Sequence, residues 1–283
     1  MVNFEVIARD LGFVEGPVWT GERVLVTSIT AGVIHELALD GSHVSVYASP
    51  GGGPNGLART TDALWAAQGG TGHFGLSYTS ERPAGLLRIT RDGAVTYAVS
   101  AGVTAPSDCA VGPDGRLWFT DPQTSLETPT PGQVLVYDTV EGTLVKATKN
   151  EHYPSGFYPN GIAFGLDSTT LYVADTKNHR VLQYHVTAQH LSEPSIFAEC
   201  HGYPDGLAVD AQGNVYVAIL TADRISVYSP SGEPLHAIEI PGSRPTNLCF
   251  AGEGLTRMIV TASKGGRVLL GDAPVPGLAL TTA

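Results

Sequence analysis

The stretch Asp205-Gly206-Leu207-Ala208-Val209-Asp210-Ala211-Gln212-Gly213-Asn214-Val215-Tyr216-Val217-Ala218-Ile219 decides the fold. Residues 206–210 read as a short strand, Gln212-Gly213 as a tight turn, and residues 214–219 as a second strand with alternating side chains. Two further strands are predicted over 224–228 and 235–240. Four short strands in succession are the content of one blade of a β-propeller.

The start of this unit recurs along the chain. The six related phrases are Glu15-Gly16-Pro17-Val18, Asn55-Gly56-Leu57-Ala58, Ser107-Asp108-Cys109-Ala110, Asn160-Gly161-Ile162-Ala163, Asp205-Gly206-Leu207-Ala208 and Thr246-Asn247-Leu248-Cys249. Their first residues lie 40 to 53 residues apart, which is the spacing of propeller blades. No long stretch has helical periodicity. We therefore predict an all-β, six-bladed β-propeller that forms a single domain over residues 1–283.

The last unit is one strand short. Strands are predicted near residues 248–251, 257–262 and 267–270, after which the chain becomes rich in proline. Residues 4–9 are expected to supply the fourth strand, so that the N-terminal strand joins the C-terminal blade and closes the ring. Deletion of the first ten residues is then expected to abolish the fold.

Composition excludes several classes of partner. The chain has 16 Lys and Arg against 27 Asp and Glu, a formal net charge of −11, and no basic run, which argues against binding to nucleic acid or an anionic membrane. The start lacks the pattern of a signal peptide, and no apolar stretch approaches about 18 residues. A cytoplasmic protein without a membrane partner is expected. Three widely spaced cysteines, Cys109, Cys200 and Cys249, are expected to be small core residues.

Three of the six phrases begin with an oxygen-bearing side chain that suits a metal. Equivalent positions in a ring of repeats converge on one axis, so Glu15, Asn160 and Asp205 are expected to meet at the mouth of the central channel. Two carboxylates and an amide favour Ca²⁺, Mg²⁺ or Mn²⁺, although the geometry could admit Zn²⁺ or Fe²⁺. The alternative is that Asn-Gly and Asp-Gly are only turn formers. Glu15-Gly16-Pro17 is no turn signal, and its presence at the same repeat phase favours the metal site.

Other residues near the predicted channel are candidates for substrate binding or catalysis. Asn55 has the same repeat phase and is expected to neighbour the metal or donate to substrate, unless it only forms a turn. Asp108 is expected to orient a water molecule, or else to accept backbone N–H groups. His73 is placed either at the pocket mouth or on a surface loop. Tyr158, with Tyr153 and Phe157, is expected to form an apolar pocket wall.

Some conspicuous residues have a structural interpretation. Trp19, Trp65 and Trp118 are expected to pack between blades. Asp121 and Asp175, each near a strand end, are expected to accept hydrogen bonds from turns and loops.

Several motifs together resemble a known family. They are Glu15-Gly16-Pro17-Val18-Trp19, Asp114-Gly115-Arg116-Leu117-Trp118-Phe119-Thr120-Asp121-Pro122, Tyr158-Pro159-Asn160-Gly161-Ile162-Ala163-Phe164, Leu171-Tyr172-Val173-Ala174-Asp175-Thr176 and Pro204-Asp205-Gly206-Leu207. This set is similar to the family of senescence marker protein, gluconolactonase and luciferin-regenerating enzyme. The resemblance implies a six-bladed propeller that hydrolyses lactones or related esters with one divalent metal.

By that resemblance Glu15, Asn160 and Asp205 match the metal ligands of the family, with Ca²⁺ as the first expectation, and Asp205 also matches its proposed base. The chain departs from the family at Ser107, where relatives usually carry an asparagine that touches substrate or serves as a fourth ligand. Ser107 is shorter, so a bridging water or an altered substrate pocket is expected there.

The predicted reaction is metal-assisted opening of a small lactone or ester. Asp205 is the candidate base, but a carboxylate bound to a dication is a poor base. Three alternatives follow: the metal itself acidifies the attacking water, Asp205 leaves the metal during the attack, or Asp108 accepts part of the proton transfer. Two alternatives stay open: a metal-dependent phosphotriesterase or fluorophosphatase, and a propeller that binds a ligand without turnover. The expected assembly is a monomer or a small homo-oligomer.

Overall fold

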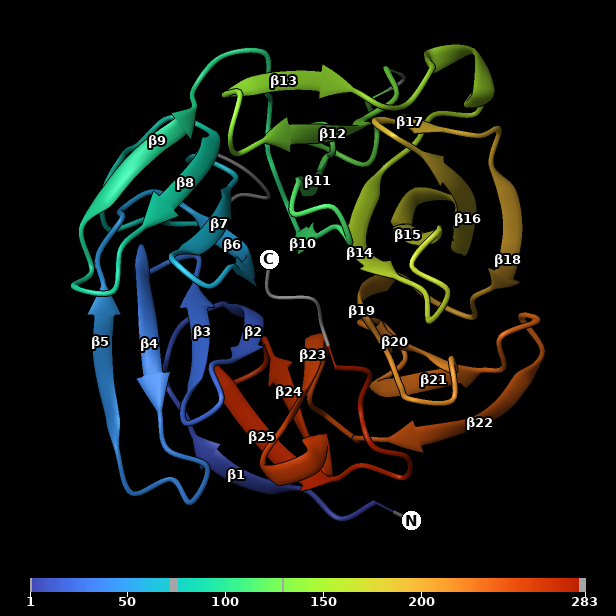
Figure 1. Ribbon diagram of the computed structural model, residues 1–283. Helices are drawn as coiled ribbons and strands as arrows, with labels where there is room; N and C mark the ends of the chain where they lie inside the picture. Colours follow the sequence, from blue (N-terminus) through green and yellow to red (C-terminus); the bar gives the residue numbers. More distant parts are fainter. Residues whose placement is uncertain (1, 72–75, 129, 280–283) are drawn as a thin grey trace.

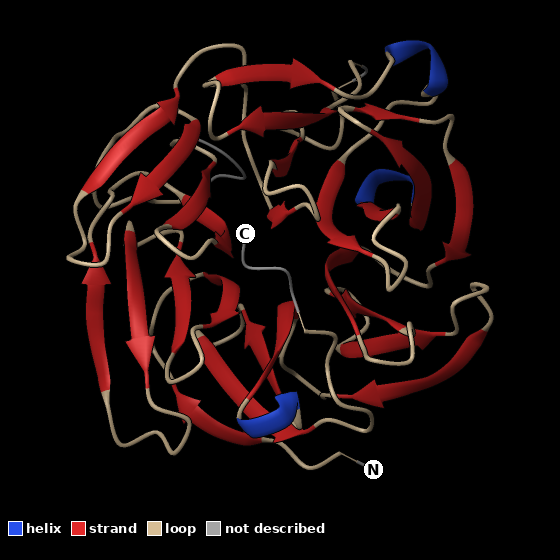
Figure 2. Ribbon diagram, in the orientation of Figure 1, coloured by secondary structure: helices blue, strands red, loops and turns tan. Residues whose placement is uncertain are grey.

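The computed structural model describes residues 2–71, 76–128 and 130–279 (Figure 1). Within these residues the chain forms strands and only three short 3₁₀ helices, η1 (Asn150–His152), η2 (Thr176–Asn178) and η3 (Glu253–Leu255) (Figure 2). Six sheets surround a central axis, with β2 (Val14–Trp19), β6 (Pro54–Arg59), β10 (Cys109–Val111), β14 (Pro159–Phe164), β19 (Pro204–Val209) and β23 (Pro245–Ala251) as their innermost strands. The predicted all-β, six-bladed propeller is confirmed. Among the described residues, no helix has the length and apolar character needed to cross a membrane.

The first three blades each contain four antiparallel strands. Blade 1 contains β2 (Val14–Trp19), β3 (Val24–Ser28), β4 (Val33–Leu37) and β5 (Val44–Ala48). Blade 2 contains β6 (Pro54–Arg59), β7 (Leu64–Gln68), β8 (Gly85–Ile89) and β9 (Val95–Val99). Blade 3 contains β10 (Cys109–Val111), β11 (Leu117–Asp121), β12 (Gln133–Asp138) and β13 (Thr143–Lys146).

The last three blades complete the ring. Blade 4 contains β14 (Pro159–Phe164), β15 (Thr170–Asp175), β16 (Arg180–Thr187), β17 (His190–Leu191) and β18 (Ser195–Glu199). Blade 5 contains β19 (Pro204–Val209), β20 (Val215–Ile219), β21 (Arg224–Tyr228) and β22 (Pro234–Glu239). Blade 6 contains β23 (Pro245–Ala251), β24 (Arg257–Ala262), β25 (Arg267–Asp272) and β1 (Glu5–Ala8).

Strand β1 comes from the other end of the chain. It pairs antiparallel with β25, with Glu5 opposite Leu270 and Ala8 opposite Val268. This is the edge at which residues 4–9 were expected. Ile7 and Ala8 are buried against the blade 1 residues Val24 and Val26. The two ends of the chain therefore share one sheet.

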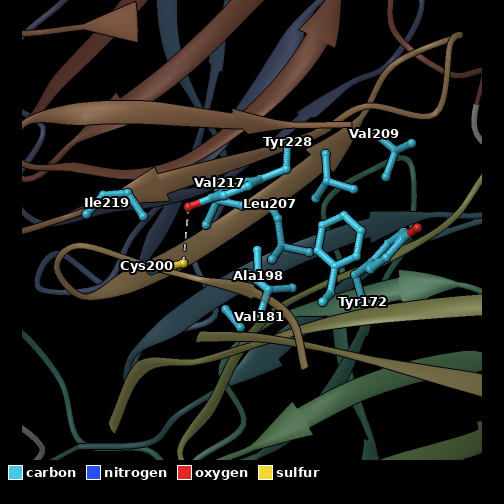
Figure 3. Close-up of a cluster of buried hydrophobic side chains, with 12 residues drawn as sticks. Tyr172, Val181, Ala198, Cys200, Leu207, Val209, Val217, Ile219 and Tyr228 are labelled. Carbon is cyan, nitrogen blue, oxygen red and sulfur yellow. Dashed lines mark hydrogen bonds between the residues drawn. The ribbon is translucent and has the colours of Figure 1, made fainter. Parts of the chain in front are cut away.

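The core is divided among six clusters, and each cluster lies between two neighbouring blades. The cluster between blades 4 and 5 includes Tyr172, Val181, Leu207 and Val217 (Figure 3). There the Tyr228 hydroxyl donates to the Cys200 thiol at 3.7 Å. Successive strand residues face opposite sides of a sheet, so each blade contributes to two clusters. Burial between blades, not one central core, holds the ring together.

The tryptophan predictions are confirmed for two residues. Trp65 lies in the cluster between blades 2 and 3, and Trp118 lies in the cluster between blades 3 and 4. Trp19 packs at the edge of the cluster between blades 6 and 1 and also lines a cavity on the axis.

Candidate functional site

The repeated phrase forms a bulge at the start of an inner strand. In five of the six inner strands the pairing register shifts at the phrase, for example between Glu15 and Val18 in β2 and between Pro159 and Ile162 in β14. A bulge re-aims the side chains around it. Glu15, Asn160 and Asp205 are each the second residue of their strand. The sequence placed these residues just before the strands, and the structure places them on the strands, at the bulges.

The inner strands approach one another closely at this level. A Cβ atom on Gly56 would lie 2.0 Å from Oδ1 of Asp108, and one on Gly206 would lie 2.1 Å from Oδ1 of Asn247. Glycine is therefore required at the second position of these two phrases, because the side chains of Asp108 and Asn247 fill the space.

Buried threonine hydroxyls hold the backbone of three of these bulges from the neighbouring blade. Thr27 donates to the carbonyl oxygen of Asn55 at 2.8 Å, and Thr120 donates to that of Asn160 at 2.7 Å. Thr246 donates to the carbonyl oxygen of Val14, next to Glu15, at 2.8 Å. The ring thereby fixes the first residue of a phrase through contacts made by another blade.

Three carboxyl groups meet on the axis. Glu15, Asp108 and Asp205 are 4%, 7% and 7% exposed. Burial and then the charge of Asp108 raise the pKa of Glu15 to about 8, and burial raises the pKa of Asp108 to about 7. Burial and the charges of Glu15 and Asp108 also raise the pKa of Asp205 well above its usual value. The predicted convergence of Glu15 and Asp205 is therefore present.

Asn247 joins two of these carboxyl groups. Its Nδ2 donates to Oε2 of Glu15 at 3.1 Å and to Oδ2 of Asp108 at 3.3 Å. Sequence interpretation missed this residue. The sequence did contain an indication of its role. Asn247 is the second residue of its phrase, where four of the six phrases have glycine and only one other, with Asp108, has a polar residue.

Asp108 accepts several hydrogen bonds. The backbone N–H of Cys109 donates to Oδ1 at 2.9 Å, and the backbone N–H of Ile162 also donates to this carboxyl group. These contacts match the predicted structural role of Asp108. Its catalytic role stays a prediction.

Asn160, Ser107 and Asn55 form a hydrogen-bonded row beside the carboxyl groups. Nδ2 of Asn55 donates to the Ser107 hydroxyl at 3.2 Å, and that hydroxyl donates to Oδ1 of Asn160 at 2.8 Å. The Asn160 side chain also forms a hydrogen bond that lowers the pKa of Asp205. Asn160 is thus brought to the carboxyl cluster, and Ser107 contacts it directly.

The aromatic residues before Asn160 separate into two groups. Tyr153 and Phe157 stack with ring centroids 4.1 Å apart inside the cluster between blades 3 and 4, where they form core. Tyr158 is buried beside Asp205, whose charge adds to burial in raising the pKa of the Tyr158 hydroxyl. His73 lies outside the described residues.

The structural interpretation of two other carboxylates is confirmed. Asp121 accepts the backbone N–H groups of Thr104 and Ala105, and Asp175 accepts the backbone N–H of Tyr158 and contacts Arg180 at 3.0 Å. Both carboxylates anchor loops.

An apolar cavity of about 330 Å³ lies on the axis past the carboxyl groups. Asp108 and Asn247 line it, whereas the first residues of the phrases do not. Its other lining residues include Cys109, Cys249 and, from the C-terminal segment, Leu278. The carboxyl cluster therefore lies between this cavity and the face on which the inner strands begin.

The donor set fits a divalent cation. Among the described residues, no group of three or more His, Cys, Asp or Glu is arranged as a metal site. The candidate ligands include only two residues of these types, Glu15 and Asp205. The third candidate ligand is the side-chain amide of Asn160. Carboxylate and amide oxygens are ligands that Ca²⁺ accepts. No Lys or Arg is among the groups that shift the pKa values of Glu15, Asp108 and Asp205, so a cation would relieve their repulsion.

Comparison with known proteins agrees with the fold and the motifs. A family model described as SMP-30/Gluconolactonase/LRE-like region matches residues 13–264. A gluconolactonase from Zymomonas mobilis is 26% identical over an alignment of 301 residues, which covers 93% of this chain and 80% of that protein. A 6-deoxy-6-sulfogluconolactonase from Pseudomonas putida is 35% identical over 133 residues. That alignment covers 44% of this chain and 45% of the relative, about half of its length.

Solved structures agree in architecture. A luciferin-regenerating enzyme superimposes with a TM-score of 0.82 at 18% identity and covers 99% of this chain and 98% of its own. A gluconolactonase from Xanthomonas campestris superimposes with a TM-score of 0.81 at 23% identity, covering 96% and 90%. At these identities the likeness establishes the fold alone.

Proposed function

Because the chain belongs to the SMP-30/gluconolactonase/LRE-like family, we propose that it is a divalent-cation-dependent hydrolase that opens lactones. The names of the Zymomonas and Pseudomonas relatives support a lactone as the substrate class. The alignment with the Zymomonas relative covers 93% of this chain, whereas the alignment with the Pseudomonas relative covers 44%. The reaction of this chain is therefore tested directly below. No feature of the described site favours a phosphotriester over a lactone.

One observation carries the proposal. Glu15, Asp108 and Asp205 are buried together, and the nearby Asn160 supplies a neutral oxygen. Burying several carboxyl groups without a balancing charge destabilises a fold, unless the groups bind protons or a cation. Such a cluster is unusual as pure scaffold and suits a cation-binding centre.

We assign Glu15, Asn160 and Asp205 as the residues that hold the cation. Ca²⁺ is our first choice because all three side chains offer oxygen, with Mg²⁺, Mn²⁺, Zn²⁺ and Fe²⁺ as alternatives. When bound, a divalent cation would polarise the lactone carbonyl and stabilise the negative charge that develops on its oxygen.

The chain itself would supply the proton acceptor. Asp205 is our candidate base. Burial, and then the charges of Glu15 and Asp108, raise the pKa of this carboxyl in the cation-free cluster, and a bound cation would lower it again and leave the carboxylate ionised to accept a proton. Asp108 accepts hydrogen bonds from Cys109, Ile162 and Asn247, which supports an electrostatic contribution more than direct proton transfer.

Substrate contacts would come from the residues around this cluster. Ser107 and Asn55 offer a hydroxyl and an amide beside Asn160, and Tyr158 lies next to Asp205. We propose these three side chains as hydrogen-bonding partners of the lactone.

The test compares matched variants on a panel of sugar-acid lactones, with paraoxon as the phosphotriester. Asp205→Asn removes the base at nearly unchanged size and should lower kcat/KM for the best lactone by about 100-fold or more. Asp138→Asn is the control, because Asp138 is equally buried, at 8% exposed, and binds Arg116 on the outer part of blade 3. Its kcat/KM should stay near the wild-type value.

Two results would contradict the proposal. If the Asp205→Asn variant hydrolyses lactones as fast as the wild type, Asp205 is not the base. Wild-type protein that hydrolyses paraoxon but no lactone would replace the substrate class.

A further inference from the structure

Asn247 lies between two carboxyl groups of the cluster. Its Nδ2 donates to Oε2 of Glu15 at 3.1 Å and to Oδ2 of Asp108 at 3.3 Å. An amide nitrogen carries two protons, so one proton is available for each carboxyl group. Asn247 is 6% exposed and is as deeply buried as the two groups that it joins. Both protons of this amide are therefore used inside the cluster.

The orientation of the Asn247 amide is set by the backbone around it. The backbone N–H of Leu248 donates to Oδ1 at 2.8 Å. If the amide were inverted, its oxygen would face two carboxyl groups and its nitrogen would face an N–H group, so donors and acceptors would be mismatched. The inner strand of blade 5 also confines the side chain, because a Cβ atom on Gly206 would lie 2.1 Å from both Cγ and Oδ1 of Asn247. Nδ2 is thus held toward Glu15 and Asp108.

The bridge occupies one oxygen of Glu15. Oε2 accepts the backbone N–H of Gly16 at 2.8 Å as well as Nδ2 of Asn247. Thr246 adds a smaller hydrogen-bonding contribution to this carboxyl group, and its hydroxyl donates to the carbonyl oxygen of Val14 at 2.8 Å. Since both N–H donors bind Oε2, Oε1 is the oxygen more available to a cation.

Asn247 lies behind the carboxyl cluster as seen from the channel mouth. It lines the axial cavity together with Asp108, whereas Glu15, Asn160 and Asp205 do not. The atom that it presents to the cluster is an amide nitrogen, which carries protons and cannot bind a cation. Asn247 would therefore affect a cation through the carboxyl groups and not as a ligand.

The bridge separates two like charges. Glu15 and Asp108 repel each other when both are ionised, and no described Lys or Arg is among the groups that act on either carboxyl group. The repulsion is therefore offset by N–H donors, of which Nδ2 of Asn247 is the one that contacts both groups. Without it, the two carboxylates would face each other with no donor between them, and the Glu15 side chain could turn away from the axis.

We propose that Asn247 is a positioning residue of the cation site: its two amide protons bridge Glu15 and Asp108, and this bridge keeps Oε1 of Glu15 directed at the axis. The inference rests on the proposed function, which makes Glu15 a ligand. It adds a side chain that touches neither cation nor substrate and that acts through the ligand it orients.

The test measures Ca²⁺ affinity of the chelator-treated full chain by isothermal titration calorimetry. Asn247→Leu keeps the branched shape of the side chain and removes both amide protons, and it should weaken Ca²⁺ binding by about 10- to 100-fold. Asn247→Ala, which has no side-chain atoms beyond Cβ to press against Gly206, should give the same loss if the leucine variant folds poorly.

Asn214→Leu is the matched control. Asn214 is 8% exposed, and its Nδ2 donates at 2.8 Å to Oδ2 of Asp210, a buried carboxyl group in the turn after β19. This variant removes an equally buried amide donor from a carboxyl group outside the cluster. It should lower the melting temperature and leave Ca²⁺ affinity within about twofold of the wild type.

A second comparison repeats Asn247→Leu in an Asp108→Asn background. This background removes one of the two like charges, so the bridge has less repulsion to offset, and the effect of Asn247→Leu on Ca²⁺ affinity should shrink to about threefold or less. General damage to β23 would cost the same affinity in both backgrounds.

The outcomes separate this inference from the proposed function. If the wild type binds Ca²⁺ and both Asn247 variants bind it equally well, Asn247 has no positioning role while the cation site stands. A loss that is just as large in the Asp108→Asn background, or in Asn214→Leu, would also overturn the role. A wild type that binds no Ca²⁺ would remove the cation site and the role of Asn247 together.

Discussion

Asp108 and Asn247 occupy the second position of the phrase, where the other four repeats have glycine. The two side chains come from blades 3 and 6, and Asn247 donates to both Asp108 and Glu15. Each therefore needs a glycine on a neighbouring inner strand, Gly56 for Asp108 and Gly206 for Asn247. At the scale of residues, the site depends on the glycines as much as on the polar groups.

The raised pKa values predict how stability depends on pH. The folded state holds protons on Glu15 up to about pH 8 and on Asp108 up to about pH 7, whereas the unfolded chain releases them near 4.5 and 3.8. The folded state binds more protons between these limits, so the contribution of these groups to the unfolding free energy falls as pH rises. The melting temperature of chelator-treated protein should accordingly drop by several °C between pH 5 and 8, since about 1 kcal/mol corresponds to roughly 2–4 °C.

Glu15→Gln is the control for this titration, because it carries no proton that can be lost. Its melting temperature, measured by calorimetry in chelator, should fall less than that of the wild type over the same pH range. Saturating Ca²⁺ should remove the drop in the wild type, since the cation binds the ionised carboxylates. Parallel pH profiles of the two proteins would contradict the raised pKa of Glu15.

Repeat phase predicted the convergence of Glu15, Asn160 and Asp205 because equivalent positions in a ring must face one axis. Asn247 was not predicted, because only the first residue of each phrase was considered as a metal ligand. In the sixth phrase that residue is Thr246, which has no carboxylate or amide oxygen. The aromatic wall was predicted too broadly. Tyr153 and Phe157 enter the interblade core, and adjacency in sequence could not show that only Tyr158 turns toward Asp205.

At the scale of elements, the C-terminal segment closes one end of the axial cavity. Backbone hydrogen bonds join Pro276 to Ala211, Gly277 to Leu255 and Leu278 to Val209. Gly277 lies so close to Phe250 that an added Cβ would be 2.2 Å from the Cβ of that residue. The proline-rich composition after residue 272 indicated the end of the strands, but nothing in the sequence showed that this segment returns to the axis.

Gly277→Ala should displace this segment and open the cavity. Cys249 lines the cavity and is partly exposed. Burial of its thiol raises the pKa to about 12, so little thiolate is present and the wild-type thiol should react slowly. In the variant, labelling of Cys249 by a maleimide should be about tenfold faster or more, as followed by mass spectrometry of peptides.

Cys200 is the internal control for this experiment. It lies in the cluster between blades 4 and 5 and hydrogen-bonds to Tyr228. Leu278 of the C-terminal segment packs against the same cluster and bonds to the backbone of Val209, which lies at the other side of the cluster from Cys200 (Figure 3). Its labelling rate should not change. Equal acceleration at both cysteines would indicate general unfolding, and an unchanged Cys249 would show that the segment does not close the cavity.

At the scale of the whole molecule, stability depends on a complete ring. Each cluster of the core needs two blades, and β1 completes blade 6 beside blade 1. The sequence predicted six blades because the repeats have regular turns and alternating strands. The sequence did not give every strand end to the residue. The bounds of β24 match the predicted 257–262, whereas β19 begins two residues before the predicted 206. The early start reflects pairing on the far side of the bulge, which periodicity does not detect.

Deletion of residues 1–8 should destabilise the ring strongly. It removes the buried side chains of Ile7 and Ala8 and leaves β25 with an unpaired edge. The free energy of unfolding by urea should fall by at least about 3 kcal/mol, from lost apolar burial and lost strand pairing. Val6→Thr, which changes a side chain that is 38% exposed on the same strand, should leave it nearly unchanged. A deletion variant as stable as the wild type would show that β1 does not support the ring.

The central claim is that oxygens from blades 1, 4 and 5 hold one divalent cation at the carboxyl cluster where a lactone is opened. An anomalous difference map from crystals grown with Mn²⁺, measured at the manganese absorption edge, tests it most directly. We predict one strong peak on the axis, in contact with the side-chain oxygens of Glu15, Asn160 and Asp205. A map with no peak at these residues, or with its only strong peak elsewhere, would contradict the claim.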